Sequence, residues 1–137
     1  MKVLVATDGS EQSLKAVQRA LELAENRGAE VTLMTVAYFA ESDLDELPLD
    51  IQDKLTAEAK AALQKAKAIF DQKNLKVGTV LETGVVPANN IIRRAQEGKF
   101  DRILLGSTGV HGLERALMGS TAAKVVNYAH CEVTVVR

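Results

Sequence analysis

Residues 2–36 read KVLVATDGSEQSLKAVQRALELAENRGAEVTLMTV, and the spacing of their apolar side chains changes twice along the stretch. Residues 2–7 are a continuous apolar run, which is typical of a strand whose two faces are both covered. After Ser10 the apolar residues recur every three or four positions, which predicts an amphipathic helix that Ser10 caps and Gly28 ends. Residues 31–36 are again a buried-type strand. The stretch therefore predicts a strand–helix–strand unit, the building block of a parallel sheet.

The alternation of strand and helix continues through the rest of the chain. Further helices are expected at residues 51–73, 87–97 and 122–129, and further strands at residues 77–81, 102–105 and 133–136. Residues 38–50 are irregular and acidic, which favours a solvated loop. Five strands with helices between them predict an α/β fold, an open twisted parallel sheet with helices on both faces. There is no internal repeat and no linker, so residues 1–137 are expected to form a single domain.

Composition and charge exclude several classes of partner. The 17 Lys and Arg residues against 18 Asp and Glu give a net charge of −1, which indicates neither a basic surface for nucleic acid nor a charged tail. The first apolar run meets Asp8 too early for a signal peptide, and no run approaches the roughly 20 apolar residues of a membrane span. The single Cys131 fits a reducing compartment. We therefore expect a cytoplasmic protein that binds neither nucleic acid nor a membrane.

Ligands of open α/β sheets bind at the carboxyl ends of the strands, where the strand order reverses. Two segments that follow predicted strands are rich in glycine and hydroxyl groups, namely residues 7–10, TDGS, and residues 106–121, GSTGVHGLERALMGST. In the second segment three glycines at intervals of three allow tight turns and a close approach of the backbone to a ligand. These two segments are the candidate binding site.

The end of the second segment indicates an anion site. Residues 119–121, GST, stand at the start of the last predicted helix, whose free N–H groups and positive dipole end attract anions. Together with the glycine turns before it, this arrangement predicts a cradle for phosphate. The alternative is a glycine turn followed by a serine N-cap, and the residues by themselves leave both interpretations open.

The predicted cradle differs from the common phosphate loops. No Lys precedes Ser120, as a Walker A motif requires, and the dinucleotide fingerprint is missing after the first strand. Residues 106–108 contain no Lys or Arg, so a triphosphate would rely on backbone amides, the helix dipole and a divalent cation. Asp8 could hold that cation or a sugar hydroxyl. Alternatively, Asp8 and Gly9 simply form the tight exit from the strand.

The chain resembles the universal stress proteins, and specifically their ATP-binding branch, over its whole length. The strand that runs into TDGS at residues 7–10 is similar to the start of that family, and AHCEVTVV at residues 129–136 is similar to its last strand. The spacing Gly106-x2-Gly109-x9-Gly119-Ser120 is the one by which ATP-binding members are distinguished from the others. Every fixed position of that spacing is present.

The resemblance implies a Rossmann-like sheet of strand order 3-2-1-4-5 that binds ATP with Mg²⁺ or Mn²⁺. It assigns contacts to the phosphates (Gly106, Gly109, Gly119 and Ser120, with Thr121 beside them), to the ribose or the metal (Asp8), to the floor of the site (Ala6 and Thr7) and to adenine (the backbone of Val36). It also implies a homodimer that pairs through the last strand, residues 132–137. The chain departs from the family at Val110, where a basic or polar residue is common.

Three functions follow from these residues. The first is an ATP-binding regulatory protein of the stress response, dimeric and with little or slow hydrolysis. No catalytic residue is assigned, because Asp8, His111 and Glu114 have no spacing that is diagnostic of catalysis. The second is a weak Mg-dependent ATPase or phosphoryl-transfer enzyme. The third is a dimeric scaffold that binds no nucleotide and whose glycines only build turns. The residues also do not distinguish between ATP, AMP and cyclic AMP as the ligand.

Overall fold

Strands and helices alternate along the parts of the chain that the computed structural model describes, which are residues 1–40, 47–108 and 118–137. The elements are β1 (Lys2–Ala6), α1 (Glu11–Arg27), β2 (Glu30–Ala37), α2 (Leu49–Asp71), β3 (Gly78–Thr83), α3 (Pro87–Glu97), β4 (Arg102–Gly106), α4 (Ser120–Tyr128) and β5 (Glu132–Val136). Each corresponds to an element expected from the sequence, with ends that differ by at most two residues.

The five strands form one parallel sheet of order β3-β2-β1-β4-β5, which confirms the expected fold class and strand order. β1 lies at the centre, where Ala6 pairs with Met34 of β2 and Val5 pairs with Leu104 of β4. The order of the strands reverses between β1 and β4. Such a switch point opens a crevice at the carboxyl edge of a sheet, because the connections leave the two strands in opposite directions.

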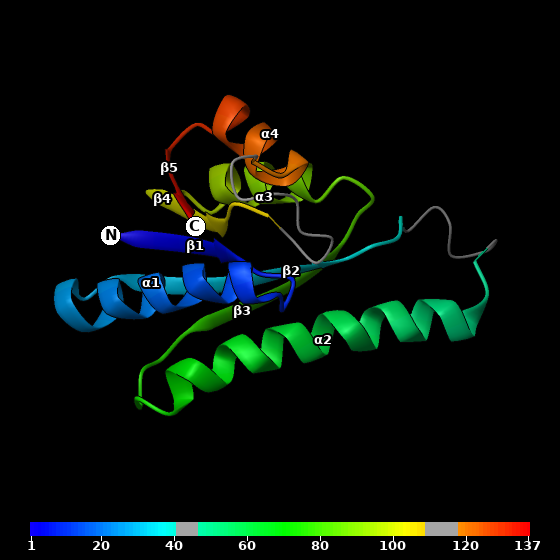
Figure 1. Cartoon of the computed structure of the whole chain (residues 1–137), viewed down its shortest axis with the longest axis horizontal. Helices are drawn as coiled ribbons and strands as arrows, with labels where there is room; N and C mark the ends of the chain where they lie inside the picture. The colour runs from blue at the N-terminus through cyan, green and yellow to red at the C-terminus, as the bar shows by residue number, and fades with distance from the viewer. Residues whose placement is uncertain (41–46, 109–117) are drawn as a thin grey trace.

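Helices cover both faces of the sheet, with α1 and α2 on one side and α3 and α4 on the other (Figure 1). Along β1, Val3 and Val5 pack on the side of α1 and α2, and Leu4 packs on the side of α3 and α4; all three are fully buried. This burial explains why residues 3–6 are all apolar instead of alternating with polar residues. No helix in the described part of the chain is long and apolar enough to cross a membrane.

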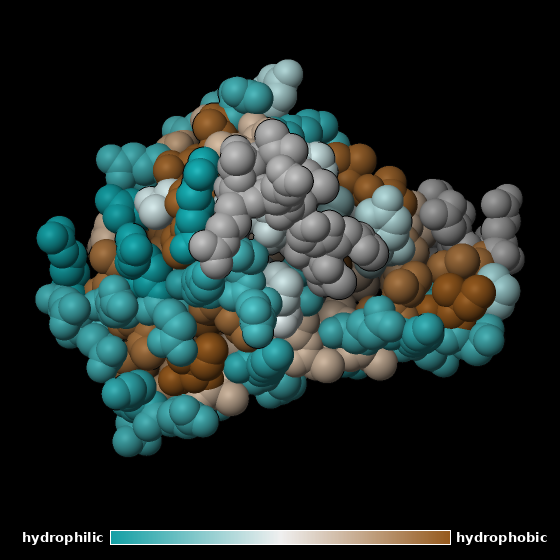
Figure 2. Space-filling model, viewed as in Figure 1, coloured by the Kyte–Doolittle hydropathy of each residue, from teal (hydrophilic) through white to brown (hydrophobic). Residues whose placement is uncertain are grey.

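Helix α1 begins and ends at the residues that the sequence predicts. The Ser10 hydroxyl accepts a hydrogen bond from the Ser13 amide (3.2 Å), and Gly28 adopts the left-handed conformation (φ +65°) that follows many helices. Helix α2 begins directly after Pro48, and Figure 2 shows apolar surface near that end, where Leu49 and Ile51 are exposed.

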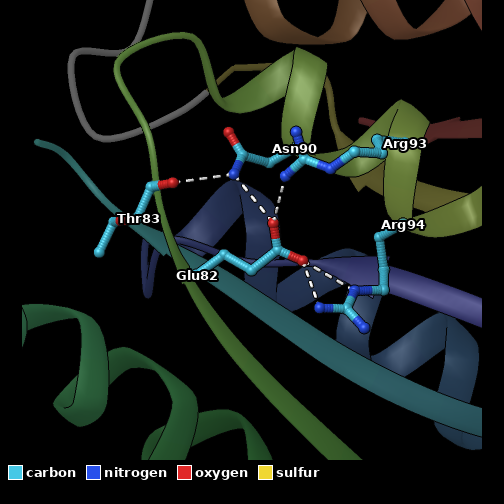
Figure 3. A network of polar contacts seen from close by, with 5 residues as sticks. All are labelled: Glu82, Thr83, Asn90, Arg93 and Arg94. Carbon is cyan, nitrogen blue, oxygen red and sulfur yellow. Dashed lines mark hydrogen bonds and ion pairs between the residues drawn. The ribbon is translucent and has the colours of Figure 1, made fainter. Parts of the chain in front are cut away.

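A polar cluster joins the edge strand β3 to α3 (Figure 3). The Glu82 carboxylate accepts hydrogen bonds from Asn90 Nδ2 (2.9 Å), Arg93 Nη2 (2.9 Å) and Arg94 Nε (2.7 Å). Asn90 Nδ2 also donates to the Thr83 carbonyl (3.0 Å). The Glu82 side chain is only 13% exposed, whereas those of Arg93 (55%) and Arg94 (38%) reach solvent. The cluster therefore fixes α3 against the sheet through charge-assisted hydrogen bonds.

Burial raises the pKa of Glu82, but the hydrogen bonds from Asn90, Arg94 and Arg93 and the charge of Arg94 lower it by more. The net result is a pKa below the ordinary value of 4.5. Folding thus favours the ionised carboxylate. Its contribution to stability is complete above the pKa of the unfolded chain and is lost as the pH falls through the lowered folded value.

We expect Glu82→Gln to reduce the free energy of unfolding at pH 7 by about 1.5–3 kcal/mol, because hydrogen bonds to a charged acceptor are lost. The difference from the parent should shrink as the pH falls below 4.5. Urea unfolding at pH 7 and at lower pH measures both effects. Glu132→Gln is the matched control, since Glu132 is 73% exposed where it pairs with Arg102, and its loss should cost at most about 1 kcal/mol. A difference that does not change with pH would contradict the assignment.

Candidate functional site

The fold brings the two predicted segments to the same edge of the sheet. Residues 7–10 follow β1, residues 106–108 follow β4, and these two strands are neighbours. In the register that pairs Val5 with Leu104, Thr7 is level with Gly106. The candidate site therefore lies at the carboxyl edge beside the switch point, as expected from the sequence.

Hydroxyl groups hold the turn at residues 7–10. The Ser13 hydroxyl donates to the Ser10 carbonyl (3.0 Å), accepts from the Asp8 amide (3.3 Å) and contacts the Thr7 hydroxyl (2.8 Å). A hydroxyl has one hydrogen and two lone pairs, so all three contacts are satisfied when Thr7 donates to Ser13. The Thr7 oxygen in turn accepts from the Gly9 amide (3.1 Å). Buried side chains thus fix the backbone that carries Asp8.

Asp8 shapes the tight turn at the exit of β1, which was the alternative interpretation of this residue from the sequence. Its Oδ1 accepts a hydrogen bond from the Ser10 amide (3.0 Å), and Gly9 follows with φ +83°. This is the local Asx-type bond by which aspartate shapes turns. The side chain is nevertheless exposed at the carboxyl edge, so this role is compatible with a contact to a ligand.

Two glycines of the second segment are closely packed against neighbouring backbone. A Cβ on Gly106 would lie 2.7 Å from the Gln12 carbonyl carbon and oxygen, so the missing side chain lets α1 approach β4. A Cβ on Gly119 would lie 3.1 Å from the Ser107 carbonyl oxygen. The sequence attributed these glycines to ligand approach, and the structure gives each of them a packing reason as well. Gly109, with its neighbours Val110 and His111, lies outside the described residues.

The two ends of the glycine segment meet. The Gly119 amide donates to the Ser107 carbonyl at 2.6 Å, which joins the exit of β4 to the start of α4. Gly119 is the N-cap residue of α4, in an extended conformation (φ −64°, ψ 161°), and Ser120 is the first helical residue. The expected alternative of a serine N-cap is therefore wrong at this helix.

The N-termini of α1 and α4 differ in how they are capped. At α1 the Ser10 hydroxyl takes one of the unpaired amides of the first turn. At α4 no side chain of the described residues caps the first turn, and the Gly119 carbonyl accepts the Ala123 amide (3.0 Å). The first-turn amides of α4, including those of Ser120 and Thr121, have no acceptor within their own helix. They lie at a half-buried to exposed position.

The remaining predicted residues surround the same edge. Ala6 ends β1 and is half-buried, Thr7 is 5% exposed, and Val36 is half-buried one residue before the end of β2. Three polar residues that the sequence analysis did not assign are also buried here, namely Ser13, Thr35 and Ser107. Ser13 could have been found from the sequence, because it lies one helical turn after an N-cap. Thr35 and Ser107 could not, because their hydrogen-bond partners, such as Thr7 and Val136, are distant along the chain.

Other features of the described residues lie away from this edge. A hollow lined by Lys67, Asp71 and Asn74, among others, is at the opposite end of the sheet, between the end of α2 and the start of β3. Within residues 1–40, 47–108 and 118–137, no group of three His, Cys, Asp or Glu side chains is placed to hold a metal ion. The carboxyl edge is therefore the best candidate site.

Comparison with known proteins agrees with the fold. The model of the universal stress protein family matches residues 1–137. Universal stress protein MJ0531 of Methanocaldococcus jannaschii is 38% identical over 141 residues, which cover 99% of this chain and 81% of that protein.

Two solved structures can be compared over the full chain. Universal stress protein UspA from Lactobacillus plantarum has a TM-score of 0.84 and 29% identity, and the match covers 100% of this chain and 97% of that one. A universal stress protein solved in complex with cAMP has a TM-score of 0.77 and 26% identity, with the same coverage of 100% and 97%.

We expect Gly106→Ala to lower the free energy of unfolding by about 1–3 kcal/mol, because the added methyl group meets the backbone of α1, which cannot rotate away. Gly78→Ala is the control: Gly78 is exposed, and its nearest neighbour is the Thr32 hydroxyl at 3.0 Å. This variant should stay within about 0.5 kcal/mol of the parent. Urea unfolding compares the two, and equal stabilities would contradict the close packing of α1 on β4.

Proposed function

The chain belongs to the universal stress protein family, and on this premise we propose that it is a nucleotide-binding regulatory protein whose preferred ligand is ATP. The observation that carries the proposal is the first turn of α4, which no side chain within residues 1–40, 47–108 and 118–137 caps and which lies beside the exit of β4 at the carboxyl edge of the sheet. Free first-turn amides and the positive end of the helix dipole favour a phosphate group at such a position.

The proposed phosphate site assigns different roles to neighbouring residues. The Gly119 amide is already bound to the Ser107 carbonyl, so Gly119 contributes mainly by having no side chain in the way. The amides of Ser120 and Thr121, together with the Ser120 hydroxyl, are the donors to phosphate. Gly106 supports them by seating α1 close to β4, and Gly109 completes the family spacing.

The nucleoside would lie along the ends of β1 and β2. Thr7 and Ala6 form the floor, Asp8 contacts the ribose or a metal, and the backbone of Val36 meets adenine. The rigid turn that carries Asp8 suits this arrangement, because its donors and acceptors are fixed before a ligand binds. A relative of 26% identity was solved with cAMP, an adenine nucleotide, which supports this class of ligand.

A divalent cation, Mg²⁺ or Mn²⁺, fits the proposed donor set. Residues 106–108 carry no cationic side chain, and Asp8 offers an exposed carboxylate at the same edge. The cation, when bound, neutralises phosphate charge. Asp8 would help to hold it.

We propose little or slow hydrolysis. Fast phosphoryl transfer needs a residue that orients water and a group that stabilises the transferring phosphoryl. Of the three candidates that the sequence offered, Asp8 has its Oδ1 engaged by the Ser10 amide, and His111 and Glu114 lie outside the described residues. The alternative is a weak Mg-dependent ATPase, and phosphate release that needs Mg²⁺ and disappears in Asp8→Ala would support it.

The phosphate site is tested by calorimetric titration with Mg-ATP of the parent, Ser120→Pro and Ser120→Ala. Proline suits the first helical position and follows the extended Gly119 without strain, so it removes one amide and keeps the helix. We expect Ser120→Pro to weaken ATP binding about tenfold or more, and Ser120→Ala, which loses only the hydroxyl, to change it far less. Adenosine, which has no phosphate, should bind all three alike.

Two results would contradict this function. Equal losses in Ser120→Pro and Ser120→Ala would show that the amide makes no contact with phosphate. No detectable binding of ATP to the parent up to about millimolar ligand, where binding is worth only about 4 kcal/mol, would favour the scaffold that binds no nucleotide.

We further propose a homodimer that pairs through β5 and a cytoplasmic location, the latter from the single Cys131. β5 is an edge strand, and the Val136 carbonyl points inward to accept the Ser107 amide (3.1 Å). The backbone groups of adjacent residues in a strand point in opposite directions. The amide of Val135, the residue before Val136, therefore faces the open edge. Helix α4, which precedes β5, also exposes the apolar side chains of Val126 and Tyr128. An open edge beside apolar surface suits pairing with a second copy.

We expect Val135→Pro to dissociate the dimer, because it removes an outward amide that cross-strand pairing needs and leaves the bonds of β5 to β4 in place. Sedimentation velocity measures the change in mass, and thermal unfolding checks that the protomer remains folded. Thr134→Pro is the contrasting variant, since its amide points toward β4 and its loss should lower stability. A dimer that persists in folded Val135→Pro would remove the last strand from the interface.

A further inference from the structure

The backbone pairing of β1 with β2 ends before β2 does. Their last backbone hydrogen bond runs from the Thr7 amide to the Met34 carbonyl (2.9 Å). In a regular parallel ladder the next two bonds would run from the Val36 amide to the Thr7 carbonyl, and from the Gly9 amide to the Val36 carbonyl. Neither is made: the paired residues end at Ala6 and Met34, and both partners of Val36 are bound elsewhere.

Two threonine hydroxyls take the place of the missing bonds. The Thr35 hydroxyl donates to the Thr7 carbonyl at 2.8 Å, and the Thr7 hydroxyl accepts the Gly9 amide at 3.1 Å. Both side chains are buried, at 3% exposed for Thr35 and 5% for Thr7. The backbone groups that would have paired with Val36 are thereby satisfied without it.

Val36 consequently presents both backbone groups toward the crevice. Met34, two residues earlier, points to β1, and Ala37 points to β3, because its carbonyl accepts the Gly84 amide (3.0 Å). Backbone direction alternates along a strand, so the amide and the carbonyl of Val36 both point to the side where β1 has ended. Within the described residues no backbone group pairs with Val36 on that side.

We propose that Thr35 is a positioning residue that keeps the Val36 backbone open to read adenine, an inference that rests on the proposed nucleotide function. Adenine offers a donor, N6–H, next to a ring-nitrogen acceptor, which complements one amide and one carbonyl. Guanine offers two acceptors, O6 and N7, on the corresponding edge and would set O6 against the Val36 carbonyl. Thr35 acts by holding the Thr7 carbonyl in a position where it accepts the Thr35 hydroxyl and not the Val36 amide; without that hydroxyl the carbonyl is expected to complete the ladder with Val36.

The test compares the parent with Thr35→Val, which keeps the side-chain shape and removes the hydroxyl, and with Thr35→Ser, which keeps the hydroxyl. Amide hydrogen exchange by NMR, without any ligand, reports on Val36. We expect a rapidly exchanging Val36 amide in the parent and in Thr35→Ser. In Thr35→Val the amide should become protected, because it closes onto the Thr7 carbonyl that has lost its donor.

Binding of three ligands distinguishes positioning from a general structural effect. Thr35→Val should weaken ATP binding about tenfold and leave GTP nearly unchanged, so that the ratio of the two affinities falls about tenfold. Tripolyphosphate, which has no base, should bind the parent and both variants alike. A merely structural role for Thr35 would weaken all three ligands together.

The inference is overturned by a protected Val36 amide in the ligand-free parent, or by an unchanged ratio of ATP to GTP affinity in Thr35→Val. Failure of the proposed function has a different signature, since the parent would then bind neither ATP nor tripolyphosphate. In that case hydrogen exchange at Val36 still decides whether Thr35 holds the ladder open.

Discussion

The parallel pairing of β1 with both β2 and β4 determines where everything else can lie. Because the chain leaves β1 toward one neighbour and β4 toward the other edge, a crevice opens at the carboxyl ends of these two strands. That pairing also demands that α1 follow β1 immediately and cross β4 closely, which only a glycine at position 106 permits. The positions of the Asp8 turn and of the start of α4 are consequences of this central arrangement.

At the open crevice the strands end, and their last backbone groups need hydrogen-bond partners. Buried side-chain hydroxyls are those partners. Thr7, Ser13 and Thr35 together bind the Thr7 carbonyl and the Asp8 and Gly9 amides. These side chains let the ladder end without leaving buried donors and acceptors unpaired. The edge can therefore be rigid while Val36 and the first turn of α4 keep backbone groups directed outward, which is the combination that a preformed ligand site needs.

The far edge of the sheet is held by different chemistry. The largely buried Glu82 and Asn90, with the more exposed Arg93 and Arg94, form a charge-assisted cluster between β3 and α3, whereas Glu132 of β5, which pairs with Arg102, is 73% exposed. A buried cluster of this kind depends on every member, because removing one leaves polar groups unpaired. The two edges of the sheet thus differ in their side-chain contacts: the β3 edge is tied to α3 through the largely buried Glu82 and Asn90, whereas the ion pair at the β5 edge is exposed.

Local patterns of residues were enough to predict the features that depend on neighbours three or four residues away, or on the run of apolar residues along a strand. These include the order of strands and helices along the chain, the Ser10 cap and the Gly28 ending of α1, and the concentration of glycine and hydroxyl groups after β1 and β4. The order of the strands across the sheet was predicted from the family resemblance instead. Three features depend on packing between distant elements: Gly106 seats α1, no described side chain caps α4, and Thr35 binds Thr7, 28 residues away. Such contacts join segments that are distant along the chain, and their geometry is set by the packing of whole elements, so no local pattern of residues specifies them.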